Sequence, residues 1–148
     1  MSDAGVPLLV DTNAFVAAFD EDDSHHEAAA AVLAGIRDGN LPYGPLFTSR
    51  FVMVETAETL LMGVDHDAAV TALSTIRDSP SVNVLSVGPR LFDRTVAQFE
   101  RYDDQSISLV DHMKAVLADE HDVKHVFAFD DDFSTLGLIR VPVDTGEA

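Results

Sequence analysis

Short apolar runs that alternate with helical segments are the feature of this sequence that most restricts its fold. The runs expected to be strands lie at residues 6–10, 46–48, 82–87, 125–129 and 138–143. Segments with the apolar spacing of helices are expected at residues 13–19, 28–38, 50–62, 65–78, 89–102 and 108–120. Strands that alternate with helices predict an α/β fold, in which a parallel sheet is covered by helices on both faces.

Capping residues support several of these helix boundaries. Ser24 and Glu27 form a capping-box pattern before the second expected helix, in which each side chain can satisfy a free amide of the first turn. Ser49 and Asp65 stand where they can cap the next two helices. Gly63 follows the third expected helix and can end it.

The length and composition suit a soluble protein with one domain. The chain has 148 residues, of which 47% are hydrophobic, and this is enough for a sizeable core. No apolar run approaches the roughly 18 residues that a membrane span requires, and the first residues do not resemble a signal peptide. The sequence contains no cysteine, which excludes disulfides and zinc–thiolate sites. We therefore expect a single domain over residues 1–148, located in the cytoplasm.

The charge is strongly acidic. Twenty-six Asp and Glu residues face nine Lys and Arg residues, so the formal net charge is −17. Proteins that bind nucleic acid are normally basic, because contacts with phosphate supply much of their affinity. Adaptation to a salt-rich cytoplasm also explains the charge, since the acids are spread along the whole chain. At ~1 M salt the Debye length is about 3 Å, and repulsion of RNA would be largely screened.

Four acidic residues occupy positions that this fold would bring together. Asp11 and Asp130 each directly follow an expected strand, and the carboxyl ends of parallel strands lie at one edge of a sheet. Asp111 lies in the first turn of the helix expected at 108–120. Glu55 follows the apolar stretch 51–54, where an acid needs a partner. We expect these four carboxylates to share one pocket.

Three of these acids also have a purely structural interpretation. Asp11 could cap a helix, and Asp111 could interact favourably with the helix dipole. Asp130 is the first of three consecutive aspartates and could belong to a solvated loop. Carboxylates that share a pocket require a counter-charge, and Mg²⁺ and Mn²⁺ prefer carboxylate and water ligands. A divalent cation on phosphate can promote attack by water, so the predicted chemistry is phosphodiester hydrolysis.

The order of these motifs resembles that of PIN-domain proteins, and of VapC-type toxin ribonucleases in particular. The resemblance spans about residues 6 to 143. The matching segments are Val10-Asp11-Thr12-Asn13, Thr48-Ser49 with Val54-Glu55, Ser108-Leu109-Val110-Asp111, Phe127-Ala128-Phe129-Asp130-Asp131-Asp132-Phe133 and Leu136-Gly137.

This resemblance implies a three-layer α/β/α sandwich with a central parallel sheet of four to five strands. It also implies Mg²⁺ or Mn²⁺ as cofactor, RNA as substrate, a homodimer, and a small antitoxin protein as partner. By the same resemblance Asp11, Glu55 and Asp111 would be the principal metal ligands, and Asp130 the fourth acid. The residues that would support the site by hydrogen bonds are Thr12, Asn13 and Ser108.

The sequence departs from the family pattern at Ala128, where a Thr or Ser often stands two places before the fourth acid. A hydroxyl that could orient a ligand or a water is missing there, and Asp132 could take the place of Asp130. Among the few basic residues, Arg50 and Lys114 are candidates for phosphate contacts, although surface ion pairs are the usual role of such residues.

Three other functions remain open. The chain could be a PIN nuclease that processes RNA without an antitoxin, or a catalytically weak module that binds metal or RNA for regulation. Receiver-type phosphoacceptor domains also place aspartates at strand ends. They need a lysine near the end of a late strand, and neither Lys114 nor Lys124 is well placed for that.

Overall fold

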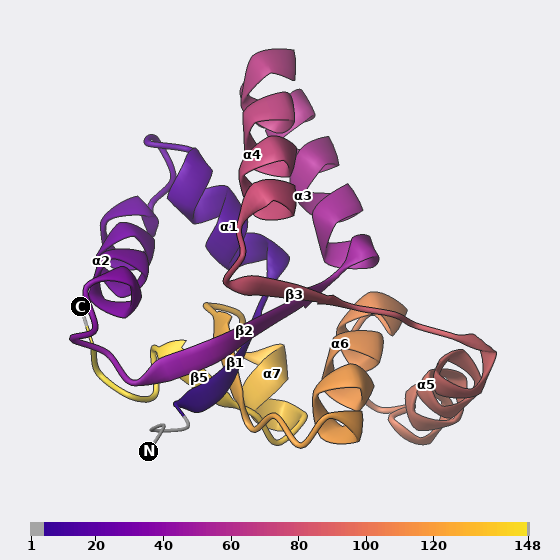
Figure 1. Ribbon diagram of the computed structural model, residues 1–148. Coiled ribbons are helices and arrows are strands. Elements are labelled where there is room, and N and C mark those ends of the chain that lie inside the picture. Colours follow the sequence, from indigo (N-terminus) through magenta and orange to yellow (C-terminus); the bar gives the residue numbers. More distant parts are fainter. Residues whose placement is uncertain (1–4, 148) are drawn as a thin grey trace.

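A five-stranded parallel sheet forms the centre of the protein. The computed structural model describes residues 5–147 and is shown in Figure 1. The strands are β1 (Val6–Val10), β2 (Tyr43–Ser49), β3 (Val82–Leu85), β4 (His125–Ala128) and β5 (Ile139–Pro142). Their order in the sheet is β3-β2-β1-β4-β5, and every pair of neighbours is parallel. The expected parallel sheet is confirmed.

Helices cover both faces of this sheet. One side carries α1 (Thr12–Phe19), α2 (His26–Arg37), α3 (Arg50–Gly63) and α4 (His66–Asp78), of which α3 and α4 project away from the sheet (Figure 1). The other side carries α5 (Pro89–Arg101), α6 (Leu109–Glu120) and the single turn α7 (Asp132–Thr135). The three-layer α/β/α sandwich is therefore confirmed.

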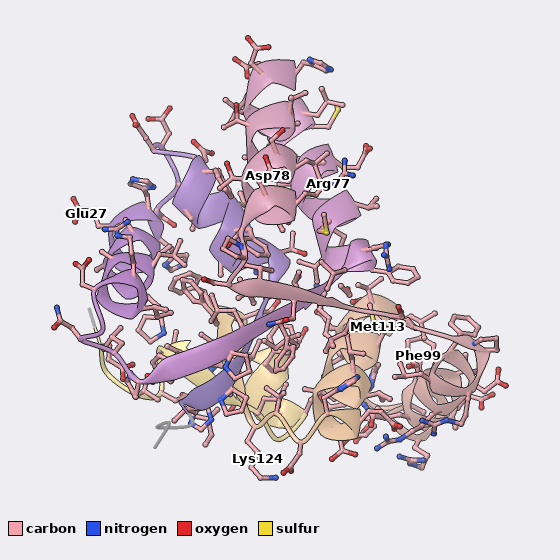
Figure 2. All side chains as sticks on the ribbon, viewed as in Figure 1. Glu27, Arg77, Asp78, Phe99, Met113 and Lys124 are labelled. Atoms are coloured by element: carbon pink, nitrogen blue, oxygen red, sulfur yellow. The ribbon has the colours of Figure 1, made fainter. Side chains whose placement is uncertain are left out.

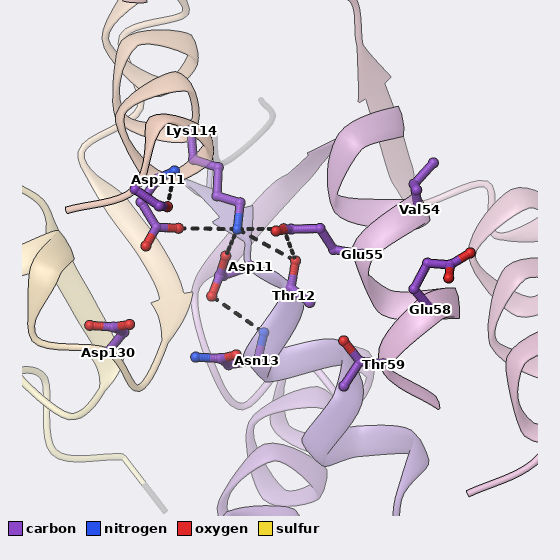
Figure 3. Close-up of a pocket in the computed structure, with 11 residues that line it drawn as sticks. Asp11, Thr12, Asn13, Val54, Glu55, Glu58, Thr59, Asp111, Lys114 and Asp130 are labelled. Atoms are coloured by element: carbon purple, nitrogen blue, oxygen red, sulfur yellow. Dashed lines mark hydrogen bonds and ion pairs between the residues drawn. The ribbon is translucent and has the colours of Figure 1, made fainter. Parts of the chain in front are cut away.

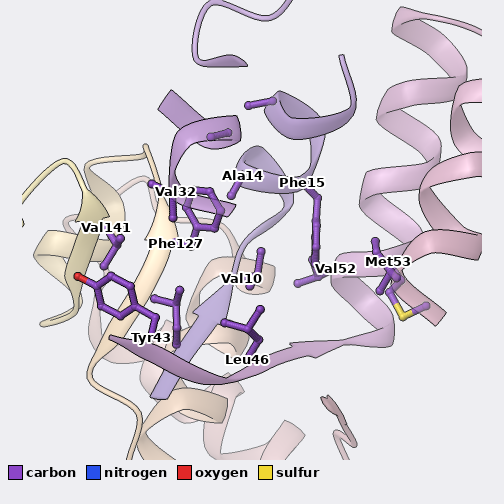
Figure 4. Close-up of a cluster of buried hydrophobic side chains, with 14 residues drawn as sticks. Val10, Ala14, Phe15, Val32, Tyr43, Leu46, Val52, Met53, Phe127 and Val141 are labelled. Atoms are coloured by element: carbon purple, nitrogen blue, oxygen red, sulfur yellow. The ribbon is translucent and has the colours of Figure 1, made fainter. Parts of the chain in front are cut away.

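Strand β1 separates two hydrophobic cores because its side chains alternate between the faces of the sheet. Leu8 and Val10 face a cluster that includes Phe15 of α1 and Val32 of α2 (Figure 4). Leu9 faces the opposite cluster, which contains residues of α6 and α7. Since β1 is buried on both faces and lies at the centre of the sheet, the residues that follow it have a fixed position.

Many charged side chains lie on the outside of this framework. Glu27, Arg77, Asp78 and Lys124 point away from the body, whereas Met113 lies inside it (Figure 2). Within residues 5–147, no helix combines the length and the hydrophobicity that a membrane span would need.

Most element boundaries agree with the expected ones within two residues, and β2 is the largest difference. It extends from Tyr43 to Ser49 rather than over residues 46–48. Proline lacks the N–H that a ladder needs, so the Gly44-Pro45 pair favoured a loop. The strand tolerates the pair because its register with β1 shifts between Val6 and Leu8, beside these two residues.

Two local expectations were wrong. Helix α2 has His25 rather than Ser24 at its N-cap position, and this cap makes no side-chain hydrogen bond. Asp23 orders the turn before α2 instead, because its carboxylate accepts a hydrogen bond from the His25 N–H at 2.8 Å. The acidic segment after Asp130 forms the helical turn α7 rather than a loop.

Candidate active site

Asp11 and Asp130 lie at the carboxyl ends of two neighbouring strands. Asp11 follows β1 and caps α1, since its Oδ2 accepts a hydrogen bond from the Asn13 N–H at 3.3 Å. Asp130 follows β4, which pairs directly with β1. The parallel topology therefore places both residues at one edge of the sheet, as expected.

Glu55 and Asp111 reach the same edge from the starts of two helices. Ser49 caps α3 by accepting a hydrogen bond from the Val52 N–H at 3.2 Å, and Glu55 lies in the second turn of that helix. The hydroxyl of Thr12 donates a hydrogen bond to Glu55 Oε1 at 2.7 Å. Ser108 caps α6 and accepts a hydrogen bond from the Asp111 N–H at 3.1 Å.

Lys114 lies in the middle of three of these carboxylates (Figure 3). Its Nζ is 2.7 Å from Asp11 Oδ1, 2.9 Å from Glu55 Oε1 and 3.3 Å from Asp111 Oδ1. The Thr12 hydroxyl lies 3.5 Å away. The Lys114 side chain is 4% exposed, so this cation is buried with its partners.

The charges in this cluster shift the pKa values of its members. Burial alone would lower the pKa of Lys114, but the charge of Asp11 and the contacts with Asp11 and Glu55 outweigh it, and the pKa rises. The pKa of Asp111 is raised, mainly because the carboxyl is buried. Asp11 and Asp130 raise it further, while Lys114 opposes the shift.

Oxygen atoms near the lysine fit a divalent cation. One carboxylate oxygen each from Asp111, Asp130 and Asp132 lie within 4.8 Å of one another. Asp11 Oδ1 is buried, and despite its ion pair with Lys114 no group of residues 5–147 donates it a well-directed hydrogen bond. Hard carboxylate oxygens of this kind suit Mg²⁺ or Mn²⁺.

All four predicted acids line one cavity. Its volume is about 420 Å³, and Val54, Glu58, Thr59 and Lys114 complete its wall together with the expected residues. The expected residues in the lining are Asp11, Thr12, Asn13, Glu55, Ser108, Asp111 and Asp130.

The two basic candidates differ in position. Arg50 is exposed and lines a separate depression together with Arg77, outside the acidic cavity. Lys114 lies inside the cavity as a buried ion-pair partner rather than as a surface one. Its spacing of three residues from Asp111 on one helix was a signal for this contact.

Ala128 has no access to the cavity. Its side chain is fully buried in the cluster with Val126 and Phe133. Asp130 lines the cavity although this hydroxyl is missing. Asp132 adds to the acids near Asp111 rather than replacing Asp130. The pKa of Asp132 is raised by burial and by the charges of Asp130 and Asp131.

Comparisons with known proteins agree with this geometry. The family described as PIN domain matches residues 8–138. The 23S rRNA-specific endonuclease VapC20 of Mycobacterium tuberculosis is 30% identical over 134 residues, which cover 90% of this chain and 97% of that protein.

Solved structures of similar proteins also resemble this chain. The crystal structure of M. tuberculosis VapC20, a sarcin-ricin loop cleaving toxin, has a TM-score of 0.80 at 28% identity and covers 89% of this chain and 96% of its own. VapBC2 from Rickettsia felis has a TM-score of 0.66 at 12% identity, with 91% and 97% covered, and supports the fold alone.

Proposed function

This chain belongs to the PIN-domain family, and we propose on that basis that it is a metal-dependent endoribonuclease and the toxin of a toxin–antitoxin pair. The observation that carries the proposal is the convergence of Asp11, Glu55, Asp111 and Asp130 on one cavity at the carboxyl edge of the sheet. Similarity to VapC20 along 90% of the chain supports the same activity.

The proposed cofactor is Mg²⁺ or Mn²⁺, and its proposed site is the cavity whose carboxylates are Asp11, Glu55, Asp111 and Asp130. When bound, such a cation neutralises phosphate charge and makes water a better nucleophile. Thr12 fixes the orientation of Glu55 through its hydrogen bond, and Ser108 fixes the first turn that carries Asp111. Asn13 lines the cavity with an exposed side chain and is proposed to contact the substrate.

The proposed substrate is structured RNA. The activity printed for VapC20 directs attention to a ribosomal RNA loop as the first RNA to test. Hydrolysis adds the oxygen of water to phosphorus, and the leaving ribose oxygen takes up a proton. The basic residues Arg50 and Lys114 remain proposed contributors to substrate binding, although Lys114 is surrounded by carboxylates.

The proposed partners are a small antitoxin protein and a second copy of the chain. Large hydrophobic side chains are exposed on α3, among them Phe51 at 49%, Val54 at 60% and Met62 at 83%. An exposed apolar surface of this kind is typical of sites that bind other proteins. Light scattering after size exclusion, with and without a coexpressed antitoxin candidate, measures both assemblies.

A cleavage assay tests the proposed activity. A labelled stem-loop from 23S rRNA is incubated at high KCl with Mn²⁺ and wild-type protein, Asp11→Asn, or wild type with EDTA. Asp93→Asn is the matched control, because Asp93 is exposed on α5, away from the cavity. The proposal is supported if the wild type and Asp93→Asn cleave the RNA while Asp11→Asn and the EDTA sample do not. Absence of wild-type cleavage across a broad RNA pool would contradict it.

A further inference from the structure

The chain has two lysines, and they occupy opposite environments. The side chain of Lys124 is 74% exposed and pairs with Asp122 on the surface. That of Lys114 is 4% exposed and lies in the acidic cavity. Burial of a lysine side chain is costly unless its charge is paired, so its position requires the carboxylates around it.

Three carboxylate oxygens and one hydroxyl oxygen surround the Lys114 ammonium group. A lysine ammonium has three N–H donors. Three carboxylate oxygens, from Asp11, Glu55 and Asp111, lie 2.7 to 3.3 Å from Nζ. These residues come from the end of β1, from α3 and from α6, so three separate elements converge on one nitrogen. The space between their carboxylates is filled by Nζ (Figure 3).

A second group of oxygens lies on the other side of Asp111. Asp130 and Asp132 approach Asp111 there, with one oxygen of each within 4.8 Å of the others. Neither Asp130 nor Asp132 makes an ion pair with Lys114. Asp111 therefore lies between the Lys114 ammonium and two further carboxylates.

We propose that the Lys114 ammonium is a resident cation that takes the place of a metal ion between Asp11, Glu55 and Asp111. The protein then accepts one divalent ion, between Asp111, Asp130 and Asp132. This inference rests on the proposed function, since it treats the cavity as a metal site. Two-metal nucleases place their ions about 3.5–4 Å apart to surround one phosphate. Lys114 supplies a fixed positive charge where the second ion would lie.

Counting bound Mn²⁺ tests the proposal. Electron paramagnetic resonance measures free Mn²⁺ during titration of metal-free protein in ~1 M KCl, where weak binding to the acidic surface is screened. Wild type and the surface control Lys124→Met are expected to bind one ion per chain. Lys114→Met, which keeps a long side chain without the charge, is expected to bind two. Asp130→Asn is expected to weaken the one wild-type site.

Two outcomes would overturn the proposal. The first is two tightly bound ions in the wild type, and the second is a Lys114→Met protein that binds the same number as wild type. If Lys114→Met does not fold, acetylation of the wild-type lysines, followed by mass spectrometry, replaces it. Lys124 is expected to react rapidly and Lys114 slowly, both without Mn²⁺ and with it. Exposure of Lys114 on addition of Mn²⁺ would mean that the metal displaces it.

RNA cleavage measured on the same samples separates this proposal from the proposed function. Mn²⁺-dependent cleavage by a wild type that binds two ions would contradict the resident cation and still support the nuclease. One bound ion without cleavage of any RNA would contradict the proposed nuclease activity and still support the resident cation.

Discussion

Asp11 shows how one side chain serves both the fold and the site. Its Oδ2 caps α1 through the Asn13 N–H, while Oδ1 faces Lys114. The structural and functional interpretations of this aspartate are therefore compatible. Because Asn is as good a helix cap as Asp, substitution by Asn separates the negative charge from the cap.

Asp11→Asn is expected to lower cleavage by roughly 10²–10³, the usual effect of removing one electrostatic group from an active site. Its unfolding free energy should fall in the metal-free protein, because the buried Lys114 loses one of its carboxylate partners although the cap is retained. Asp11→Ala should lose the activity and about 1 kcal/mol more stability than Asp11→Asn, because it also removes the cap. Urea denaturation beside the cleavage assay checks both. Equal loss of stability in the two variants would refute the separation of roles.

Lys114→Met is expected to destabilise the metal-free protein by about 2 kcal/mol, because three carboxylates lose their counter-ion. This loss of unfolding free energy is smaller than for a fully buried ion pair, because the Glu55 side chain is 39% exposed and water screens its charge. Urea denaturation in EDTA measures the loss, and Mn²⁺ should restore part of it. Lys124→Met should stay within about 0.5 kcal/mol of wild type. Similar losses in both variants would argue against the ion pairs.

At the scale of elements, helix caps bring the acids to the cavity. Ser49, Asp65 and Ser108 each accept a backbone hydrogen bond at the start of a helix, as the sequence predicted for the first two. The same cap that stabilises α6 also holds the turn that carries Asp111. Changes at such caps should therefore affect stability and activity together.

Ser108→Ala tests this coupling. The substitution removes the cap of α6 and is expected to lower the unfolding free energy by about 1 kcal/mol. Cleavage should fall as well, because the turn that carries Asp111 loses a hydrogen bond. Ser108→Asn, which retains capping ability, should recover both properties. Thermal unfolding and cleavage rates compare the three proteins, and an unrecovered Asn variant would point to a direct role of the hydroxyl.

Local patterns were enough to predict most elements of this fold. The strand at residues 6–10 and the helix from Arg50 needed no information from distant residues, because the apolar pattern and Ser49 define them. Strand β2 could not be bounded in this way, since Pro45 is tolerated through its register with β1. The start of α2 depended on whether Ser24 or Asp23 ordered the turn, and both residue types favour such a position.

The candidate site was predictable where chain order determines it. Asp11 and Asp130 follow strands, and parallel strands bring them to one edge. The placement of Lys114 was not predictable, because its burial depends on Asp11 and Glu55, which come from distant segments. Of its three ion pairs, only the one with Asp111 could be seen in the sequence, as a spacing of three residues.

At the scale of the whole molecule, repulsion between acids opposes folding. The net charge is −17, and the nine basic residues can pair with a minority of the 26 acids. Some pairs are nevertheless formed between elements, as Arg90 and Arg94 of α5 pair with Glu120 of α6. Salt should weaken the repulsion more than it weakens these few pairs.

Raising KCl from about 0.1 M to about 1 M shortens the screening length from about 10 Å to about 3 Å. The melting temperature at neutral pH is therefore expected to rise. Differential scanning calorimetry with KCl and with NaCl measures this change, and equal effects of the two salts would identify screening as the cause. A melting temperature that does not respond to salt would contradict adaptation of this surface to a saline cell.

At low salt and without metal, protonation of two partly buried carboxyls should also raise the melting temperature. The pKa values of Asp111 and Asp132 are raised in the folded state, mainly by burial, so the folded protein holds these protons more tightly than the unfolded chain. Burial lowers the pKa of His112, so protonation of this imidazole opposes the effect, and His112→Gln removes that opposition. The melting temperature of His112→Gln should rise as the pH falls from 7 to about 5. The pKa of Glu120 is lowered by Arg90 and Arg94, so loss of its pairs begins at lower pH. A falling melting temperature over this range would contradict the shifts.

The order of the strands also has a consequence for the biosynthesis of the protein. Asp11 is made before Asp130, and the two meet only when β4 takes its place beside β1. A ribosome that has not yet made β4 therefore carries an incomplete cavity. If the product cuts ribosomal RNA, the ribosome that makes it is protected until Asp130 has left the exit tunnel.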